Sequence, residues 1–167
     1  MTERVFIIED LLSPEECQYI IEKFTNSDLV KADLNGADYM KGTIYDKQIA
    51  DVLQSRLGNR LPKDNSVVGL SDRLRFSKYD KGGEFAIHQD GIHQDPRTGH
   101  RSAYTLSIYL NDTFAGGETT FFDGNDISGL LLSMRLGWAP LMYRGSLGHT
   151  VLTRDLSSSF RAHVIYR

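Results

Sequence analysis

A series of short strand-like runs, broken by glycine, aspartate and asparagine, fills the chain from about residue 74 to its end. Each run is shorter than an ordinary helix and is rich in β-branched and aromatic residues. In order, the runs are LRFSKY, EFAIH, YTLSIYL, ETTFF, a segment around ISGLLLSM, GWAPLMY and RAHVIY. The sequences Lys81-Gly82-Gly83 and Ala115-Gly116-Gly117 suit turns between them. Because no helical pattern alternates with these runs, the succession favours a β-sandwich or jelly roll over a parallel βαβ sheet.

The N-terminal part of the chain predicts a short strand and then a helix. The strand is the apolar run from Val5 to Ile8. Ser13 can cap a helix, Pro14 suits its first position and Glu16 completes a capping box. Apolar residues then recur on one helical face, at Cys17, Ile20, Ile21 and Phe24. We therefore expect this face to pack into the core, with its cysteine as a core residue and not a redox group.

A second helix is predicted from Asp46 to about Leu57, ending before Gly58. The apolar residues expected on one side of it are Ile49, Val52, Leu53 and Leu57. Both helices have the pattern of packing elements, so the predicted fold class is mainly β with flanking helices (α+β). The 167 residues fit one domain, because a single core usually serves about 100 to 200 residues. We expect helical support over about 1–65 and a jelly-roll core over about 72–167.

Charge and composition exclude several classes of partner. The formal net charge is -3 and no run of lysine and arginine occurs, which argues against binding to nucleic acid or to an anionic membrane. No stretch approaches the roughly 18 to 20 apolar residues of a membrane helix. The lone cysteine cannot form an internal disulfide, and the N-terminus has acids where a signal peptide would be apolar. These features lead us to expect a cytoplasmic protein.

One run carries a pair of residues that can bind a metal. In EFAIHQD, strand alternation puts His88 and Asp90 on the same face, two residues apart. Two histidines and one carboxylate leave three positions on an Fe(II) ion for a chelating co-substrate and dioxygen. The pair alone is weak, because such spacing also arises by chance on surface strands. A third ligand must come from one of the other histidines, His93, His100, His149 and His163.

Several ordered motifs resemble the prolyl 4-hydroxylase-like branch of the 2-oxoglutarate and Fe(II)-dependent oxygenases. The stretch RFSKYDKGGEFAIHQDG has that family's aromatic residue, glycine-rich turn and HxD motif in the same order. SIYLNDTFAGGETTFF, GWAPLMYRGSLGHTVL and RAHVIYR are similar to its later strands, and VFIIEDLLSPEECQYIIEKF is similar to its N-terminal strand and helix. The resemblance therefore covers nearly the whole chain. It implies an enzyme, a 2-oxoglutarate-dependent dioxygenase with a double-stranded β-helix.

The resemblance implies an iron site made of His88, Asp90 and His149. His88 and Asp90 have the family's spacing from Tyr79, whereas His93 and Asp95 follow Gly91 in a polar loop over about 89–103. His93 is thus expected to be a solvated loop histidine, with a substrate contact as the alternative. His149, in the apolar context SLGHTVL, corresponds to the family's distal histidine, and its alternative is a structural histidine inside the barrel.

The resemblance also implies residues that hold 2-oxoglutarate. Its distal carboxylate suits an arginine fork, and Arg161 follows His149 by 12 residues (161 minus 149), on the closing strand. If Ser157 or Ser159 occupied that position instead, Arg154 would compete for the role. Tyr79 is expected to add a hydroxyl to the same carboxylate. Tyr109 and Thr119 correspond to pocket positions, although either could be barrel core.

The expected reaction is oxidative decarboxylation of 2-oxoglutarate with dioxygen on Fe(II), coupled to hydroxylation of a substrate, with ascorbate as the reductant if one is needed. Asp90 favours hydroxylation over halogenation, because related halogenases have a small residue at that position. The substrate would be a small molecule, a peptide or a protein, with a prolyl residue or an amino acid as the first candidates. Arg97, Arg101 and Arg144 lie near the expected rim, where they either meet an anionic substrate or are solvated.

Two alternatives from other functional classes stay open. The first is a non-catalytic cupin-like barrel that binds a metal or a small ligand. The second is an interaction module that keeps only the fold, and the intact set of His88, Asp90 and His149 argues against it. Trp138 is expected to pack in the barrel, with a substrate platform as its alternative.

Overall fold

The computed structural model describes residues 5–32, 39–60, 67–83, 92–113, 119–121, 132–134, 150–154 and 160–166, with the backbone alone for 5–7 and for every range from 119 on. Among these residues, no helix has both the length and the apolar composition needed to span a membrane.

Helix α1 (Pro14–Thr25) has the predicted start and the predicted buried face. The Ser13 hydroxyl accepts a hydrogen bond from the Glu16 amide at 3.3 Å, and the Glu16 carboxylate accepts one from the Ser13 amide at 2.8 Å. The buried residues of α1 are Cys17, Ile20, Ile21 and Phe24, as predicted. Burial raises the pKa of the Cys17 thiol to about 11, which agrees with its prediction as a core residue.

Helix α2 (Lys47–Leu57) also lies where it was predicted, with Asp46 as its N-cap. The Asp46 carboxylate accepts a hydrogen bond from the Ile49 amide at 2.9 Å. The predicted apolar face was wrong at one position, because Val52 is 42% exposed and Ala50 is buried instead. Ala50 lies three residues before Leu53, on the same helical row, whereas Val52 is turned about 100° away from Leu53.

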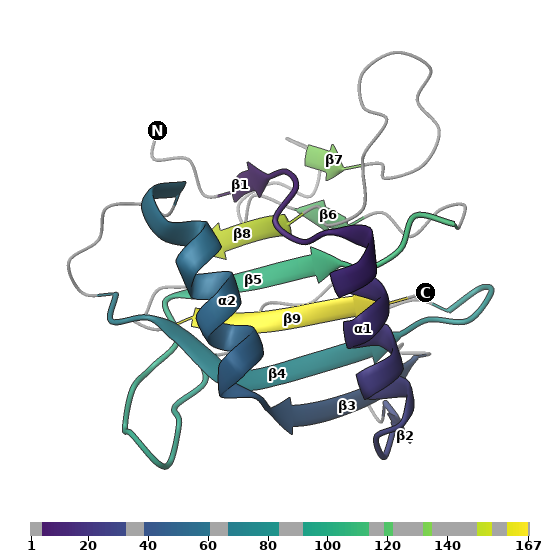
Figure 1. Ribbon diagram of the computed structural model, residues 1–167, viewed down its shortest axis with the longest axis horizontal. Coiled ribbons are helices and arrows are strands. Elements are labelled where there is room, and N and C mark those ends of the chain that lie inside the picture. The colour runs from purple at the N-terminus through teal and green to yellow at the C-terminus, as the bar shows by residue number, and fades with distance from the viewer. Residues whose placement is uncertain are drawn as a thin grey trace.

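The strands form one seven-stranded sheet in the order β1-β8-β5-β9-β4-β3-β2 and a separate two-stranded sheet, β6-β7 (Figure 1). The strands are β1 (Val5–Ile8), β2 (Val30–Lys31), β3 (Met40–Tyr45), β4 (Leu70–Lys78), β5 (Tyr104–Tyr109), β6 (Thr119–Phe121), β7 (Leu132–Met134), β8 (Thr150–Arg154) and β9 (Phe160–Tyr166). Both α1 and α2 lie across one face of the larger sheet (Figure 1). The fold is therefore α+β.

The two faces of strand β4 lie in different surroundings, one in the core and the other on the opposite side of the sheet. Leu74 and Phe76 are fully buried beneath the helices, and the Phe76 ring stacks on Phe24 of α1 with 4.6 Å between ring centroids. Because successive side chains alternate, Arg73 and Arg75 lie on the opposite face. We call this face, which α1 and α2 do not cover, the far face.

Strands β2 and β3 were not predicted. In β3 the run MKGTIY contains Gly42, which weakens a strand pattern. A Cβ atom at Gly42 would come within 2.8 Å of Leu29 Cδ2, so the glycine permits close packing there. Strand β9 runs parallel to both β4 and β5, whereas a jelly roll is built from antiparallel strands. The jelly roll thus stays a prediction, and the runs EFAIH and GWAPLMY lie outside the described residues.

Loss of the N-cap should destabilise the protein. Ser13→Ala leaves the Glu16 amide without its side-chain acceptor, so we expect the free energy of unfolding to fall by about 1 kcal/mol. Urea denaturation followed by circular dichroism measures this change. Ser55→Ala, at an exposed position inside α2, is the matched control and should leave stability unchanged or slightly higher. Equal effects of both substitutions would show that the cap contributes nothing.

Candidate metal and co-substrate site

The three predicted iron ligands, His88, Asp90 and His149, lie outside the described residues, and so does Arg144. The structure does describe the chain on either side of these ligands. Gly83 precedes the segment with His88 and Asp90, and Thr150, the first residue of β8, directly follows His149. These flanking residues show which end of the sheet the ligand-bearing segments adjoin.

Both flanks lie at one end of the larger sheet. Lys78 at the end of β4 pairs with Tyr166 of β9, and Tyr109 at the end of β5 pairs with Ile165. Thr150 pairs with Ile108, next to Tyr109. The last residues of β4, β5 and β9 therefore lie beside the first residue of β8.

A tight turn follows β4 at this end. The Gly83 amide donates to the Asp80 carbonyl at 2.8 Å, and Gly82 has a φ of 83°, which glycine adopts without strain. This is the turn predicted at Lys81-Gly82-Gly83. It redirects the chain immediately before the segment that carries the HxD motif.

A pair of stacked tyrosines stands beside the turn. Tyr79 directly follows β4, and its ring stacks on Tyr39 with 4.9 Å between centroids. Tyr39 is buried, and burial raises the pKa of its phenol, while the positive charge of Arg75 opposes this shift. Tyr109 is also buried. Tyr39 was not predicted from the sequence, because its position depends on the pairing of β3 with β4.

The backbone register does not bring Arg161 and Tyr79 together. Arg161 pairs with Thr105, whereas Tyr79 lies just beyond the pairing of Lys78 with Tyr166. Five residues separate Arg161 from Tyr166 (166 minus 161), which is about 17 Å along a strand. The register gives only the backbone positions of the two residues, so the expectation that both bind one carboxylate stays a prediction.

The other candidate residues fall at separate places. Thr119 is in β6 and pairs with Met134 of β7, in the two-stranded sheet. Arg154, the alternative to Arg161, pairs with Tyr104 at the far end of β5 from Tyr109. For these residues the structure gives strand positions, and their roles remain predictions.

The polar loop after the HxD motif contains a hairpin over residues 92–103. Gln94 and Arg101 form an antiparallel bridge, and the Ser102 amide donates to the His93 carbonyl at 2.8 Å. The His93 amide in turn donates to the Ser102 hydroxyl at 2.9 Å. His93 is half-buried, with its Nε2 atom inside the protein, so its prediction as a solvated histidine was wrong. The hydrogen bonds to Ser102 hold the His93 backbone in the hairpin.

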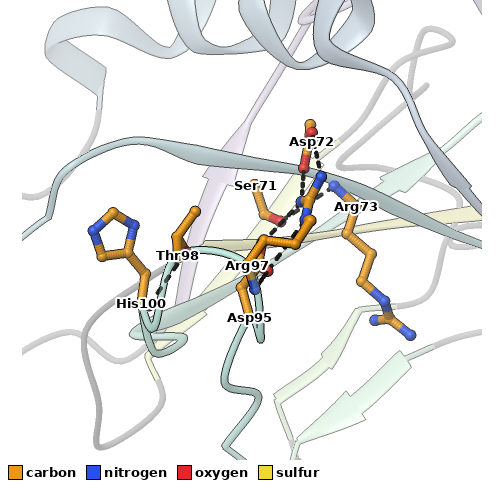
Figure 2. A network of polar contacts seen from close by, with 7 residues as sticks. All are labelled: Ser71, Asp72, Arg73, Asp95, Arg97, Thr98 and His100. Atoms are coloured by element: carbon orange, nitrogen blue, oxygen red, sulfur yellow. Dashed lines mark hydrogen bonds and ion pairs between the residues drawn. The ribbon is translucent and has the colours of Figure 1, made fainter.

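Arg97 fastens this hairpin to β4 (Figure 2). Its guanidinium donates to both carboxylate oxygens of Asp72, at 2.5 and 3.1 Å, and to both oxygens of Asp95, at 3.2 and 2.8 Å. It also lies over the Tyr45 ring, 4.3 Å from the centroid. These hydrogen bonds lower the pKa of Asp95 to about 2. Arg97 thus holds the hairpin in place while its side chain stays exposed, as predicted for a solvated arginine, and a substrate contact of Arg97 stays untested.

The chemistry of the predicted donor set fits Fe(II), because two imidazoles and one carboxylate suit this ion and leave positions for small ligands. Within the described ranges, no group of three or more histidine, cysteine, aspartate or glutamate side chains could hold a metal. In particular, His93 and Asp95 do not form a second site there, and Asp95 is instead bonded to Arg97.

Comparison with known proteins finds two plant relatives. The chain is 29% identical to "Prolyl 4-hydroxylase 2" of Arabidopsis thaliana over 149 aligned residues, which cover 78% of this chain and 47% of the relative. It is 29% identical to "Probable prolyl 4-hydroxylase 7" of the same plant, over 72% of this chain and 42% of the relative. The chain therefore spans somewhat less than half the length of these relatives. No family model and no solved structure matches it.

Removing the Arg97 clamp should loosen the hairpin. Arg97→Gln loses the charge that bonds Asp72 and Asp95, so we expect the Gly99 and Ser102 amides to exchange hydrogen faster, on the order of tenfold. Exchange measured by NMR tests this expectation. The control is Arg101→Gln, an exposed arginine of the same hairpin.

The same clamp should open in acid. Because the pKa of Asp95 is lowered from 3.8 to about 2, its stabilising effect is fully present above pH 4 and is lost as the pH falls through about 2. Exchange corrected for its intrinsic pH dependence should rise over this range in the wild type and much less in Arg97→Gln. The same rise in both proteins would exclude the clamp as its cause.

Proposed function

We propose that this chain, a distant homologue of the plant prolyl 4-hydroxylases in the 2-oxoglutarate oxygenase superfamily, is an Fe(II)- and 2-oxoglutarate-dependent hydroxylase. One structural observation supports the proposal beyond homology. The turn that leads towards His88 and Asp90, and the strand start that follows His149, adjoin the same end of the sheet. Ligands so far apart in the sequence need such an arrangement to reach one ion.

The distances allow this convergence. Strands β4, β9, β5 and β8 are neighbours, so three strand spacings of about 4.8 Å each, roughly 14 Å in all, separate β4 from β8. The nine residues from Tyr79 to His88 can extend to about 30 Å, which exceeds that span. If the pairing of β5 with β8 continued by one residue, His149 would lie opposite Tyr109. We infer that the metal binds near Tyr109, at this end of the sheet.

When bound, the iron and 2-oxoglutarate would supply the oxidation of a substrate C–H bond with dioxygen, and the remaining tasks belong to the protein. His88, Asp90 and His149 would hold the ion and leave three positions for other ligands. Arg161 would bind the distal carboxylate. Its pairing partner Thr105 is four residues from Tyr109, about 13 Å along the strand, which an arginine side chain and a 2-oxoglutarate molecule can bridge together.

We propose separate roles for Arg161 and Tyr79, because their backbone positions differ by about 17 Å along the strands. We assign Arg161 to the distal carboxylate of 2-oxoglutarate, and Tyr79 to the end of the site where the metal and the substrate meet. The buried Tyr109 would line the same end and exclude water. We retain Thr119 as a proposed pocket residue, a single domain over 1–167, and closure of a jelly roll by residues outside the described ranges.

The names of the relatives make a prolyl residue the first substrate to test, with a free amino acid as the second. A non-catalytic barrel that binds metal is the alternative. It would bind Fe(II) without converting 2-oxoglutarate to succinate under any condition.

Removal of a metal ligand should abolish both iron binding and turnover. In His88→Ala or Asp90→Ala, we expect no Fe(II) bound under anaerobic conditions and succinate formation at background, because two remaining ligands hold the ion weakly. Calorimetry measures the first and a succinate assay the second. The control is His93→Ala, which removes the neighbouring histidine copy and should keep iron bound. Undiminished turnover in His88→Ala would disprove the assignment.

Loss of the proposed carboxylate ligand should act on the co-substrate. Arg161→Ala should raise the KM for 2-oxoglutarate by on the order of tenfold or more, because a charged hydrogen-bonding partner is lost. Arg154→Ala is the matched comparison on β8. An unchanged KM in the first variant and a raised KM in the second would transfer the role to Arg154.

A further inference from the structure

Two arginines on the far face differ in their ion pairing from the other arginines near the sheet whose side chains the structure describes. Arg73 and Arg75 are half-buried neighbours on one face of β4, about 7 Å apart at their Cα atoms as alternate residues of a strand. Within the described part of the chain, neither guanidinium forms an ion pair with a carboxylate. Partial burial makes an unpaired charge costly, so this arrangement needs an explanation.

Arg56 and Arg97 provide the contrast. Arg56 donates to both carboxylate oxygens of Glu16, at 2.6 and 2.5 Å, and joins α2 to α1. Arg97 joins the hairpin to Asp72 and Asp95. Arg56 and Arg97 are exposed, whereas Arg73 and Arg75 are half-buried, and yet it is the two exposed arginines that have carboxylate partners. Among the residues that the structure describes, acids thus pair with these two arginines and not with the pair on the far face.

A neighbouring lysine adds positive charge to the face that carries Arg73 and Arg75. Strand pairing places Tyr45 opposite Arg73, Thr43 opposite Arg75, and Lys41 opposite Ser77. The side chain of Lys41 therefore shares the far face with both arginines and is diagonal to Arg75. Figure 2 shows the Arg73 side chain leaving the strand on the side away from the helices, while Asp72 is bonded to Arg97, whose guanidinium also lies over the Tyr45 ring. The acid nearest in sequence is thus unavailable to Arg73.

The pair continues the row of β4 residues that ends at the proposed active site. Arg75 is close enough to Tyr39 for its charge to act on that phenol, and Tyr39 stacks on Tyr79. Tyr79 directly follows β4 and lies four residues beyond Arg75, about 13 Å along an extended chain. This distance is spanned by about four residues of an extended peptide. The two arginines therefore lie along a path that leads away from the metal end of the sheet.

We propose that Arg73 and Arg75 bind a carboxylate of the substrate, so that the enzyme prefers acidic substrates. The proposal rests on the hydroxylase function and names a substrate class for it. The preferred peptide would carry aspartate or glutamate within about four residues of the target residue. Two adjacent guanidinium groups suit a carboxylate because each offers parallel N–H donors. The co-substrate is assigned to Arg161, on another strand.

Peptide binding to the full-length, metal-free protein tests the proposal without relying on turnover. The probes are fluorescently labelled prolyl peptides with blocked ends and either glutamate, glutamine or lysine at positions two and four from the proline on both sides. We expect the wild type to bind the glutamate peptide at least about tenfold more tightly than the glutamine peptide, and this preference to weaken with salt. Fluorescence anisotropy measures each Kd.

The variants identify the residues responsible. Arg73→Gln and Arg75→Gln should each weaken the preference for glutamate, and the double variant should remove it. Arg101→Gln, an exposed arginine on the hairpin, is the control and should retain it. The double charge reversal, Arg73→Glu with Arg75→Glu, should shift the preference to the lysine peptide, which shows that the protein still folds and binds. An unchanged preference in the double Gln variant would overturn the proposal.

Two further binding measurements distinguish which molecule supplies the carboxylate that the arginines bind. If free proline binds and the blocked peptides do not, and the double Gln variant loses proline, the arginines bind the α-carboxylate of a free amino acid. If 2-oxoglutarate alone displaces the glutamate peptide and the double variant loses 2-oxoglutarate binding, the pair serves the co-substrate and the proposal fails. Failure of the hydroxylase function is separate, since it is an absence of Fe(II)-dependent succinate formation in the wild type.

Discussion

The stacking of Phe24 on Phe76 fixes the orientation of β4, and the functional residues depend on that orientation. Both rings are fully buried, and they join α1 to the sheet. Because strand side chains alternate, burial of Phe76 under the helix sends Arg75 to the far face. A shift of β4 by one residue would expose Phe76 and bury the arginines, at a cost of several kcal/mol for the aromatic ring alone. The same hydrophobic contact thus stabilises the core and positions the residues of the proposed site.

The elements that the sequence predicted well are those encoded by neighbouring residues. The capping box of α1 needs only Ser13 and Glu16, and its buried face repeats within one helix. The strand β3 could not be predicted in this way, because Gly42 weakens its local pattern and is explained only by the distant Leu29 side chain above it. The burial of Ala50 in place of the predicted Val52 has a related cause, because a small residue can face the sheet where space is limited. Packing between distant segments decided both positions.

In the candidate site, too, features encoded by neighbouring residues could be predicted, and features that depend on distant segments could not. The HxD motif is local, so strand alternation alone predicts His88 and Asp90 as a metal-binding pair, and this pair lies outside the described residues and stays a prediction. The Arg97 clamp joins residues 25 apart in the sequence, and no local pattern distinguishes Arg97 from the other loop arginines. The distance between Arg161 and Tyr79 depends on whether β9 runs parallel or antiparallel to β4, which neither strand specifies alone. Long-range pairing therefore limits what the sequence can predict about co-substrate binding.

The overall charge of the chain and the charge of its far face point to different kinds of partner. A net charge of -3 gives no general attraction for polyanions, and this remains a sound reason to expect no nucleic acid. Anion binding at a defined site requires only a few cations held close together, and β4 with β3 gathers Arg73, Arg75 and Lys41 on one face. Among the described residues, Asp72 and Asp95 are bonded to Arg97, and Glu16 is bonded to Arg56. An acidic protein can therefore hold a locally basic group of side chains, because the net charge does not determine where the individual charges lie.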